Sequence, residues 1–215
     1  MSSAGVSFIN CLYLILTMRI ILTRHSETEE NKAGITQGHL PGKLSELGIE
    51  QAKKLALRLK DEKIDVIYSS DLARAADTTK EIVKFHPDVP FHLTNDLRER
   101  NMGEFQGRKS SETGFEKAKR EGKPFPVPKN GETTEEMCLR AKRLFDNIFH
   151  KHMENTVLLV GHGGINLALI SAITRKPFMD VVKTCGIENT SVNIFEINKG
   201  RSHKIHCLNC TKHLD

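Results

Sequence analysis

Cysteine is scarce in this sequence, and its distribution does not suit a fold stabilised by disulfide bonds. The 215 residues contain five cysteines, an odd and scattered set. They are Cys11, Cys138, Cys185, Cys207 and Cys210. Such cysteine usage is typical of proteins in a reducing compartment, because secreted domains of this kind pair their cysteines. We therefore expect a cytoplasmic protein.

The sequence also gives little indication of a metal site. Cys207 and Cys210 have C-x-x-C spacing, with several histidines nearby, but no second matching pair accompanies them. A structural zinc site usually needs four such ligands. Two interpretations stay open, a metal site or a final strand and tail that carry cysteines by chance. We favour the second, and we expect neither a metal nor another cofactor.

The sequence lacks a run long enough to cross a membrane. Its N-terminal apolar stretch, residues 6–17, is shorter than the roughly 20 residues that a bilayer span needs. The stretch also lacks the positive segment and small-residue cleavage site of a signal peptide. We interpret residues 1–17 as an extension, such as an upstream start codon would produce, and residues 18–215 as one domain. No membrane association is expected.

A dense block of basic residues is also missing. The chain has 32 lysines and arginines against 27 aspartates and glutamates, a formal net charge of +5, and the basic residues are dispersed. A nucleic-acid-binding arm would concentrate them, so no nucleic-acid partner is expected. The mild positive excess suits a small anionic substrate. The sequence leaves open whether the protein is a monomer or a homodimer.

Short apolar strands alternate with amphipathic helices along the chain. The predicted strands cover residues 18–23, 65–69, 91–97, 156–160, 191–197 and 204–208. The predicted helices cover residues 45–59, 72–85, 132–152 and 165–174. The proline-rich segment 122–131 is expected to be irregular. This alternation indicates crossover connections, and therefore an α/β fold: a three-layer α/β/α sandwich with a mostly parallel sheet.

Polar side chains stand where several of these strands end. The first predicted strand runs into Arg24 and His25, and the fourth runs into His162. A third strand end leads to Arg74 in the first turn of a helix, and another leads to Glu99. Ligands of open α/β sheets bind outside the carboxyl ends of the strands. We therefore expect these five side chains to converge on one edge of the sheet.

Phosphoryl transfer needs these residue types. Its transition state spreads negative charge over three equatorial oxygens, so catalysis rests on positioning and electrostatic stabilisation. Arginine offers a rigid fork of donors that stays charged. A neutral imidazole can attack phosphorus and form a phosphohistidine, and a nearby carboxylic acid can protonate the leaving oxygen. This chemistry requires no metal, and the sequence shows no carboxylate cluster that would hold one.

At these residues the chain resembles the histidine phosphatase superfamily, also called the phosphoglycerate mutase-like family. The motifs of that family occur in order between Met18 and about Ile197. They are R-H-G-x-T-x-x-N at 24–31, the phosphate-loop pair at 37–38, L-[ST]-x-x-G-x-x-Q-A at 44–52, S-[DS]-L-x-R-A-x-x-T at 70–78, L-x-E-x-x-x-G at 97–103, G-E-[ST] at 131–133 and V-G-H-G-G at 160–164.

The resemblance implies a role for each matching position. His25 would be the phosphorylated nucleophile, and Glu99 would act first as general acid and then as general base. Arg24, Arg74 and His162 would complete the catalytic set by binding the phosphoryl oxygens. The full set of expected substrate-binding residues is Arg24, Asn31, Gln37, Gly38, Arg74, Arg98, His162 and Gly163.

Some positions depart from the family pattern or lie outside it. Ser26 replaces the usual glycine of the signature, a small-for-small change, and Gln106 stands where the family often has glutamate. A second anionic group of the substrate would have three candidate partners, Arg98, Arg100 and Lys109. The histidines to which we assign no role are His39, His86, His92, His150 and His152.

The implied activity is hydrolysis of small phosphomonoesters, such as sugar phosphates or phosphoglycerates. Residues 97–103 are similar to the fructose-2,6-bisphosphatase-like and broad-specificity phosphatase branches. A cofactor-dependent phosphoglycerate mutase shares the catalytic set, but that branch carries a longer insertion after Glu99. Here we expect only a short proline-rich loop between Gly107 and the long helix. A phosphoprotein phosphatase and a non-catalytic phosphate-binding relative are further alternatives, and retention of the catalytic set argues against the latter.

Overall fold

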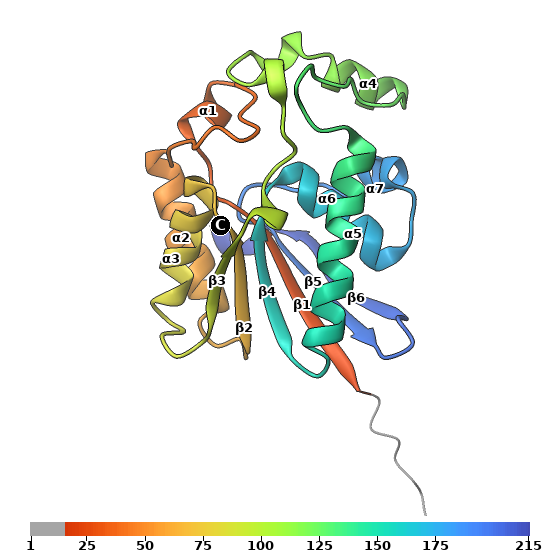
Figure 1. The fold of residues 1–215 in the computed structure, drawn as a ribbon. Helices are drawn as coiled ribbons and strands as arrows, with labels where there is room; N and C mark the ends of the chain where they lie inside the picture. The colour runs from red at the N-terminus through yellow and green to blue at the C-terminus, as the bar shows by residue number, and fades with distance from the viewer. Residues whose placement is uncertain (1–15) are drawn as a thin grey trace, which may run out of the picture.

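A computed structural model describes residues 16–215. Most of the predicted N-terminal extension, residues 1–15, therefore lies outside the described residues. The first strand, β1 (Thr17–Arg24), begins one residue before the expected boundary at Met18. It runs through the middle of the sheet (Figure 1).

The described part of the chain forms a six-stranded, mostly parallel sheet. The strand order is β3-β2-β4-β1-β5-β6. The first four strands in this order pair in parallel, whereas β5 and β6 run antiparallel to their neighbours. The remaining strands are β2 (Val66–Ser70), β3 (Phe91–Thr94), β4 (Thr156–Gly161), β5 (Val192–Asn198) and β6 (His203–Cys210).

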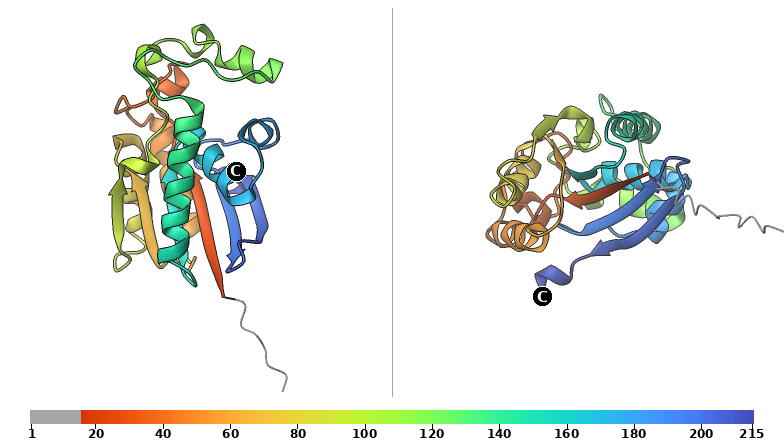
Figure 2. Two further views of the ribbon diagram at one scale, coloured as in Figure 1. Left: turned by 45° about the vertical axis from the view of Figure 1, so that its right-hand side comes forward. Right: turned by 90° about the horizontal axis from the view of Figure 1, so that it is seen from below.

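Helices cover both faces of the sheet, which confirms the predicted three-layer α/β/α sandwich (Figure 2). The helices of one face are α2 (Glu46–Leu59) and α3 (Ala73–Val83). Those of the other face are α5 (Thr134–Lys151), α6 (Gly163–Thr174) and α7 (Phe178–Thr184). The short helices α1 (Glu29–Lys32) and α4 (Phe115–Glu121) lie beyond the carboxyl ends of the parallel strands (Figure 1).

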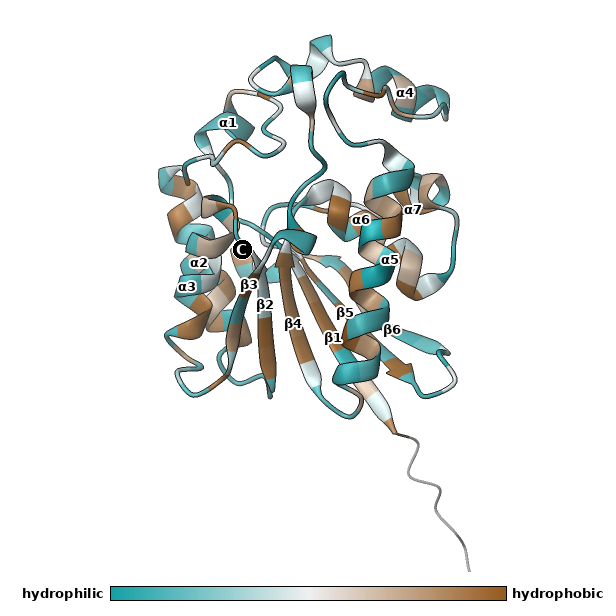
Figure 3. Cartoon of the chain, in the orientation of Figure 1, coloured by the Kyte–Doolittle hydropathy of each residue, from teal (hydrophilic) through white to brown (hydrophobic). Residues whose placement is uncertain are grey.

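The alternation of side chains along each strand divides the core into two parts. In β1, Met18, Ile20 and Leu22 pack with α5 and α6, whereas Ile21 packs with α2 and α3. Successive strand side chains point to opposite faces, so a strand covered on both faces must be apolar throughout. The central strands show this pattern as continuous hydrophobic segments (Figure 3). They form a rigid platform at whose edge the chain can present polar groups.

Two long helices begin at side-chain caps. The Ser45 hydroxyl accepts a hydrogen bond from the Gly48 N–H at 3.0 Å and starts α2. Thr133 and Glu136 form a reciprocal capping box at the start of α5. These hydrogen bonds satisfy backbone donors that a helix terminus otherwise leaves unpaired.

The segment between Gly107 and α5 differs from the prediction. It holds more than a short proline-rich loop, because a 3-10 helix, Ser110–Glu112, and helix α4 precede the irregular residues 122–131. We call residues 110–131 the cap, since they lie over the carboxyl edge of the sheet (Figure 1). The predicted strand 91–97 is also shorter, because its last three residues form a 3-10 helix, Asn95–Leu97.

The C-terminal cysteines lie in and at the end of β6. The Cys207 thiol donates a hydrogen bond to the Val192 carbonyl at 3.5 Å. Within residues 16–215, histidine, cysteine and acidic side chains form no group of three or more that could hold a metal ion. None of the helices in that range has the length and apolar character to cross a membrane.

Candidate active site

Two neighbouring parallel strands bring His25 and His162 together. The register pairs Arg24 in β1 with Gly161 in β4, so the next residue of each strand is a histidine at the same edge. The His25 N–H donates to the Gly161 carbonyl at 3.0 Å. The imidazole rings lie 5.0 Å apart between centroids, and both are buried. The sheet register thus places two imidazoles side by side.

The tautomer of His25 follows from the hydrogen-bond partner of its Nδ1 atom. Its Nδ1 lies 2.7 Å from the Ser26 carbonyl oxygen, which can only accept, so Nδ1 carries the proton and Nε2 keeps its lone pair. Burial lowers the pKa of His25 well below its usual value, and the charges of Arg24 and Arg74 lower it further. The ring is therefore neutral near pH 7, with a free nucleophilic nitrogen.

His162 has the opposite tautomer. Arg74 donates from Nε to His162 Nδ1 at 3.1 Å, so the proton of the neutral ring is on Nε2. Burial, followed by the charge of Arg74, holds the pKa of His162 well below its usual value. Its Nε2 is buried and has no hydrogen-bond partner among the described residues. This N–H is a donor for an oxyanion, at the N-cap of α6, where the helix dipole also favours negative charge.

Two arginines flank the histidines, Arg24 half-buried and Arg74 buried. Arg24 donates from Nη1 to the Ile187 carbonyl at 2.8 Å, and its Nε is buried without a partner in the described chain. Arg74 is 1% exposed, and burial lowers its pKa to about 10, which leaves it charged near neutral pH. Its Nη2 donates to the Gly38 carbonyl at 2.8 Å, and its Nη1 donates to the Leu40 carbonyl. Arg74 therefore joins α3 to the loop after α1.

Glu99 is held by three backbone N–H groups. Its Oε1 accepts from Arg100 N at 2.9 Å and from Ile165 N at 3.2 Å, and its Oε2 accepts from Gly164 N at 3.0 Å. Two of these donors belong to the first turn of α6, the helix that His162 caps. The carboxyl group and the second histidine are thus fixed by the same helix terminus.

The loop after α1 supplies the other expected residues. Asn31 caps α1 reciprocally with Thr28, and the Gln37 amide donates to the Thr28 hydroxyl at 2.9 Å. Gly38 has a left-handed backbone with φ of +53°, and a Cβ there would lie 2.5 Å from Gln106 Oε1. Only glycine suits this conformation and space.

Ser26, which replaces the family glycine, has a structural contact of its own. Its buried hydroxyl lies 3.0 Å from the Thr78 hydroxyl, which in turn donates to the Arg74 carbonyl at 2.7 Å. The Ser26 N–H also donates to Thr78 at 3.0 Å. The serine therefore ties the loop that sets the His25 tautomer to the helix that carries Arg74.

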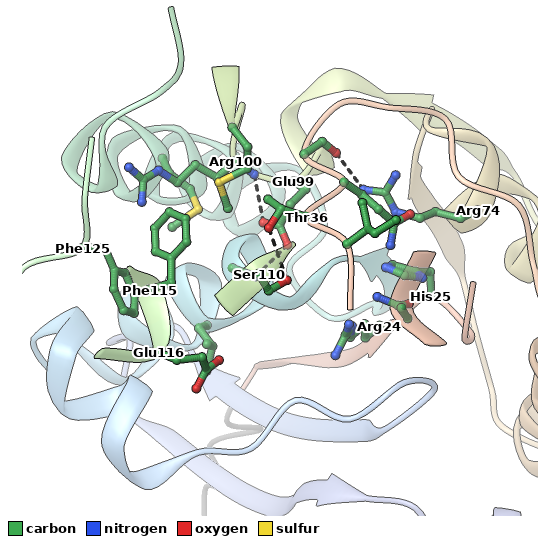
Figure 4. A pocket seen from close by; sticks show the side chains of 18 of the residues that line it. Arg24, His25, Thr36, Arg74, Glu99, Arg100, Ser110, Phe115, Glu116 and Phe125 are labelled. Carbon is green, nitrogen blue, oxygen red and sulfur yellow. Dashed lines mark hydrogen bonds between the residues drawn. The ribbon is translucent and has the colours of Figure 1, made fainter. Parts of the chain in front are cut away.

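These groups surround one cavity of about 270 Å³ (Figure 4). His25, Arg24 and Arg74 stand at one end, and Phe115, Glu116 and Phe125, which belong to the cap, stand at the other. Asn31, Gln37, Gly38, Glu99 and Gly164 also line the cavity. His162 and Gly163 lie behind this lining, next to His25 and Glu99 respectively.

Arg98, another expected substrate-binding residue, does not line the cavity either, and its side chain is bound elsewhere. Its Nε and Nη2 donate to the two Asp71 carboxylate oxygens at 2.7 and 2.6 Å, and it lines a separate surface groove beside Arg140. We therefore do not retain Arg98 in the site. Lys109 donates to the Ala33 carbonyl and lies outside the cavity, whereas Arg100 lines it.

Sequence reasoning missed two residues. His39, to which we assigned no role, donates from Nε2 to the Glu99 carbonyl at 2.8 Å and so supports the backbone of the acid. Asn189 donates from its side chain to the His25 carbonyl at 2.9 Å. Their distance along the chain from Glu99 and His25 hid both contacts, although His39 directly follows the phosphate-loop pair.

The sequence pattern of the histidine phosphatase superfamily (branch 1) matches residues 20–211, and the chain belongs to this superfamily. The family and the phosphatases among its relatives identify the chain as a phosphoric monoester hydrolase. The chain is 30% identical over 203 residues to phosphoglycerate mutase-like protein 4 of Arabidopsis thaliana, and the aligned region covers 91% of this chain and 86% of the relative. It is 35% identical over 189 residues to a metal-independent phosphoserine phosphatase of the same plant, covering 83% and 76%.

Solved structures agree with this assignment. A mycobacterial glucosyl-3-phosphoglycerate phosphatase in complex with VO3 superposes with a TM-score of 0.80. The sequences are 27% identical, and the match covers 90% of this chain and 99% of that one.

Proposed function

We propose that the protein hydrolyses small phosphomonoesters through a phosphohistidine formed on His25. The observation that carries the proposal is the complementary pair of tautomers, a bare Nε2 on His25 and an unpartnered N–H on His162. A nucleophile and an oxyanion donor are thus adjacent, with the charges of the half-buried Arg24 and the buried Arg74 beside them. A dianionic phosphoryl group satisfies all of these groups at once.

In the first step, His25 Nε2 attacks phosphorus in line, and the bond from phosphorus to the leaving oxygen breaks. Glu99 Oε2 accepts only one hydrogen bond, so it has a lone pair for the proton that a phosphomonoester monoanion brings. It passes this proton to the leaving oxygen. The Ser26 carbonyl stabilises the positive charge that develops on the imidazole through its bond to Nδ1.

In the second step, water attacks the phosphohistidine. Glu99 takes a proton from the water, the P–N bond breaks and inorganic phosphate forms. The fixed position of Glu99 at the start of α6 lets one carboxyl group serve both steps. The arginines and His162 hold the equatorial oxygens throughout, without a change in their own protonation.

The size of the cavity and the activities of relatives support a small substrate. A volume of about 270 Å³ fits a metabolite. The names of the relatives describe phosphatases of phosphoserine and of glucosyl-3-phosphoglycerate. The proposal includes a cytoplasmic protein that acts as a monomer or a homodimer. Cell fractionation and light scattering of the purified protein test these two parts, and a membrane-bound pool or a higher oligomer would contradict them.

The test compares hydrolysis of p-nitrophenyl phosphate by the wild-type protein and the His25→Ala variant. We expect the variant to lose at least about a thousandfold in kcat, because no other group supplies the nucleophile. Alkaline quenching during turnover of a radiolabelled substrate should trap an acid-labile phosphoprotein in the wild type only. The exposed His92 gives a matched control, His92→Ala, with unchanged kcat. Activity that survives in His25→Ala would refute the mechanism.

A mutase would behave differently with the same reagents. Incubation with 3-phosphoglycerate and a primer bisphosphate separates the two activities by product. We expect release of inorganic phosphate. Efficient formation of 2-phosphoglycerate with little phosphate release would identify a mutase and contradict the proposal.

A further inference from the structure

The end of the cavity opposite His25 is lined by aromatic side chains. Phe115, Phe125 and Phe178, which we call the aromatic wall, come from the start of α4, the irregular part of the cap and the start of α7. We propose that this wall binds the alcohol part of the substrate, so that the preferred substrates are phosphomonoesters of alcohols with a flat, uncharged apolar group. The inference rests on the proposed function and specifies its substrate class.

The rings of the wall are arranged edge to face. Phe115 and Phe125 lie 5.5 Å apart between centroids with an interplanar angle of 75°, and Phe125 and Phe178 lie 6.2 Å apart with an angle of 78°. Aromatic pairs prefer this geometry, which positions rings from three separate segments relative to one another. The wall is therefore a built surface rather than a chance group of side chains.

The rings of the wall are only half buried. Each keeps part of its surface on the cavity, next to the further apolar side chains of Ile35, Met102 and Leu167. Apolar surface gains free energy when a ligand removes it from water, and a flat ligand can cover several rings at once. A concave apolar surface facing a few convergent polar groups is the usual form of a small-molecule site.

One carboxylate and one guanidinium lie at this end of the cavity. The Glu116 carboxylate is exposed at the rim and repels negative groups. The guanidinium carbon of Arg100 lies 5.4 Å from the Phe115 ring centroid, and its Nε and Nη2 donate to the Glu132 and Pro126 carbonyls at 2.6 and 2.7 Å. Arg100 thus supports the ring of Phe115, while its Nη1 has no partner among the described residues. Because that nitrogen is a donor for an anion, the test below includes an anionic substrate, 3-phosphoglycerate.

Three substrates distinguish a preference for an apolar group from a preference for a second anion. All three carry the phosphate on a primary alcohol, so their leaving groups have the same chemistry. They are 2-phenylethyl phosphate, glycerol 1-phosphate and 3-phosphoglycerate. We expect kcat/KM for 2-phenylethyl phosphate to exceed the other two by about tenfold or more, the scale of discrimination that apolar pockets achieve. Equal values, or a preference for 3-phosphoglycerate, would overturn the inference and leave the phosphatase activity intact. Hydrolysis of none of the three would instead refute the proposed function.

Substitution of the wall assigns the preference to it. In Phe125→Ala we expect the ratio of kcat/KM for 2-phenylethyl phosphate to that for glycerol 1-phosphate to fall about tenfold. Phe125→Leu keeps an apolar side chain in case the alanine variant unfolds, and its ratio should fall in the same direction. Phe85→Ala removes a phenylalanine that is 44% exposed and outside the cavity, so the ratio should not change. An unchanged ratio in the folded Phe125 variants would overturn the inference.

Discussion

At the scale of single residues, the site depends on which nitrogen of each imidazole carries the proton. A carbonyl beside His25 and a guanidinium beside His162 impose opposite tautomers on two adjacent rings. Desolvation keeps both rings neutral, since a buried imidazolium between two arginines would be unfavourable. The reactivity of the site therefore follows from two hydrogen bonds and from burial.

This burial predicts how stability changes with pH. Below about pH 6.5 the unfolded chain protonates His25 and His162, whereas the folded protein does not, because burial lowers both pKa values. The unfolded state then binds more protons than the folded state. The free energy of unfolding therefore has its full value above about pH 6.5 and falls as the pH decreases below it. Urea denaturation at pH 7.5, 6.5 and 5.5 measures this slope.

A variant isolates the contribution of the site. His39, His152 and His213 also have pKa values lowered by burial and add to the slope in the same direction. We therefore expect His25→Gln to reduce the slope between pH 6.5 and 5.5, and we expect His92→Gln, which removes an exposed imidazole, to leave it unchanged. Equal slopes in wild type and His25→Gln would show that His25 is protonated in the folded protein.

At the scale of secondary structure elements, the first turn of α6 holds the Glu99 carboxylate in position. Gly161 to Gly164 carries the chain from a buried strand into a helix, and the first turn of that helix donates two N–H groups to Glu99. The absence of a side chain at Gly164 matters, because a Cβ there would lie 2.6 Å from Glu99 Oε1. Glycine is needed here because it leaves space for the carboxylate, and not because the backbone adopts a left-handed conformation.

Gly164→Ala is therefore expected to damage catalysis without damaging the fold. The methyl group displaces the Glu99 carboxylate, and misplacement of a catalytic group by about 1 Å can cost up to about a hundredfold in rate. Alanine is the better helix former, so the free energy of unfolding should change by less than about 1 kcal/mol. Steady-state kinetics with an alkyl phosphate and thermal denaturation measure the two effects.

The matched control is Gly200→Ala in the turn between β5 and β6. A Cβ at this position would make an ordinary contact of 3.4 Å with the Asn198 side chain, far from the site along the chain. We expect unchanged kcat and stability in this variant. Full activity in Gly164→Ala would mean that the position of Glu99 seen here is not the one used in catalysis.

At the scale of the whole molecule, the sheet is the frame that the other parts share. Strands from distant parts of the sequence end at one edge, and the cap, α1 and α7 close the space above it (Figure 1). The backbone of Thr190 contributes from the far end of the chain, donating to the Arg24 carbonyl at 3.1 Å. The site is therefore assembled from segments that the folded sheet brings together.

This frame predicts that a chain beginning at Met18 is functional. Within the register of residues 16–215, a start at Met18 deletes one pair, Thr17 with Asn198, and leaves β1 paired from Met18 to its carboxyl end. We expect the free energy of unfolding to change by less than about 1 kcal/mol and kcat/KM to stay within about twofold. Urea denaturation and hydrolysis of p-nitrophenyl phosphate test this, and a shortened chain that fails to fold or loses activity would place residues 1–17 within the domain.

Much of this architecture could be predicted from local chemistry. Buried strands need continuous apolar segments, helices need caps such as Ser45, and histidines directly after two such strands must lie at a sheet edge. Helix α4 gave no comparable signal, because only Ala118 of its seven residues is buried and no apolar stripe marks it. Its position depends on aromatic contacts with Phe125, which belongs to a segment that looks irregular in the sequence.

The sequence by itself therefore determined the sandwich, the strand ends and the identity of the reactive groups, since these depend on neighbours close along the chain. Only the tertiary structure decided which way the two arginines beside Glu99 point, with Arg98 bound to Asp71 and Arg100 turned toward Phe115. It also decided the tautomers of His25 and His162 and the form of the aromatic wall. Each of these depends on partners that are brought together by the packing of the cap and helices on the sheet, and local sequence patterns carry no information about such contacts.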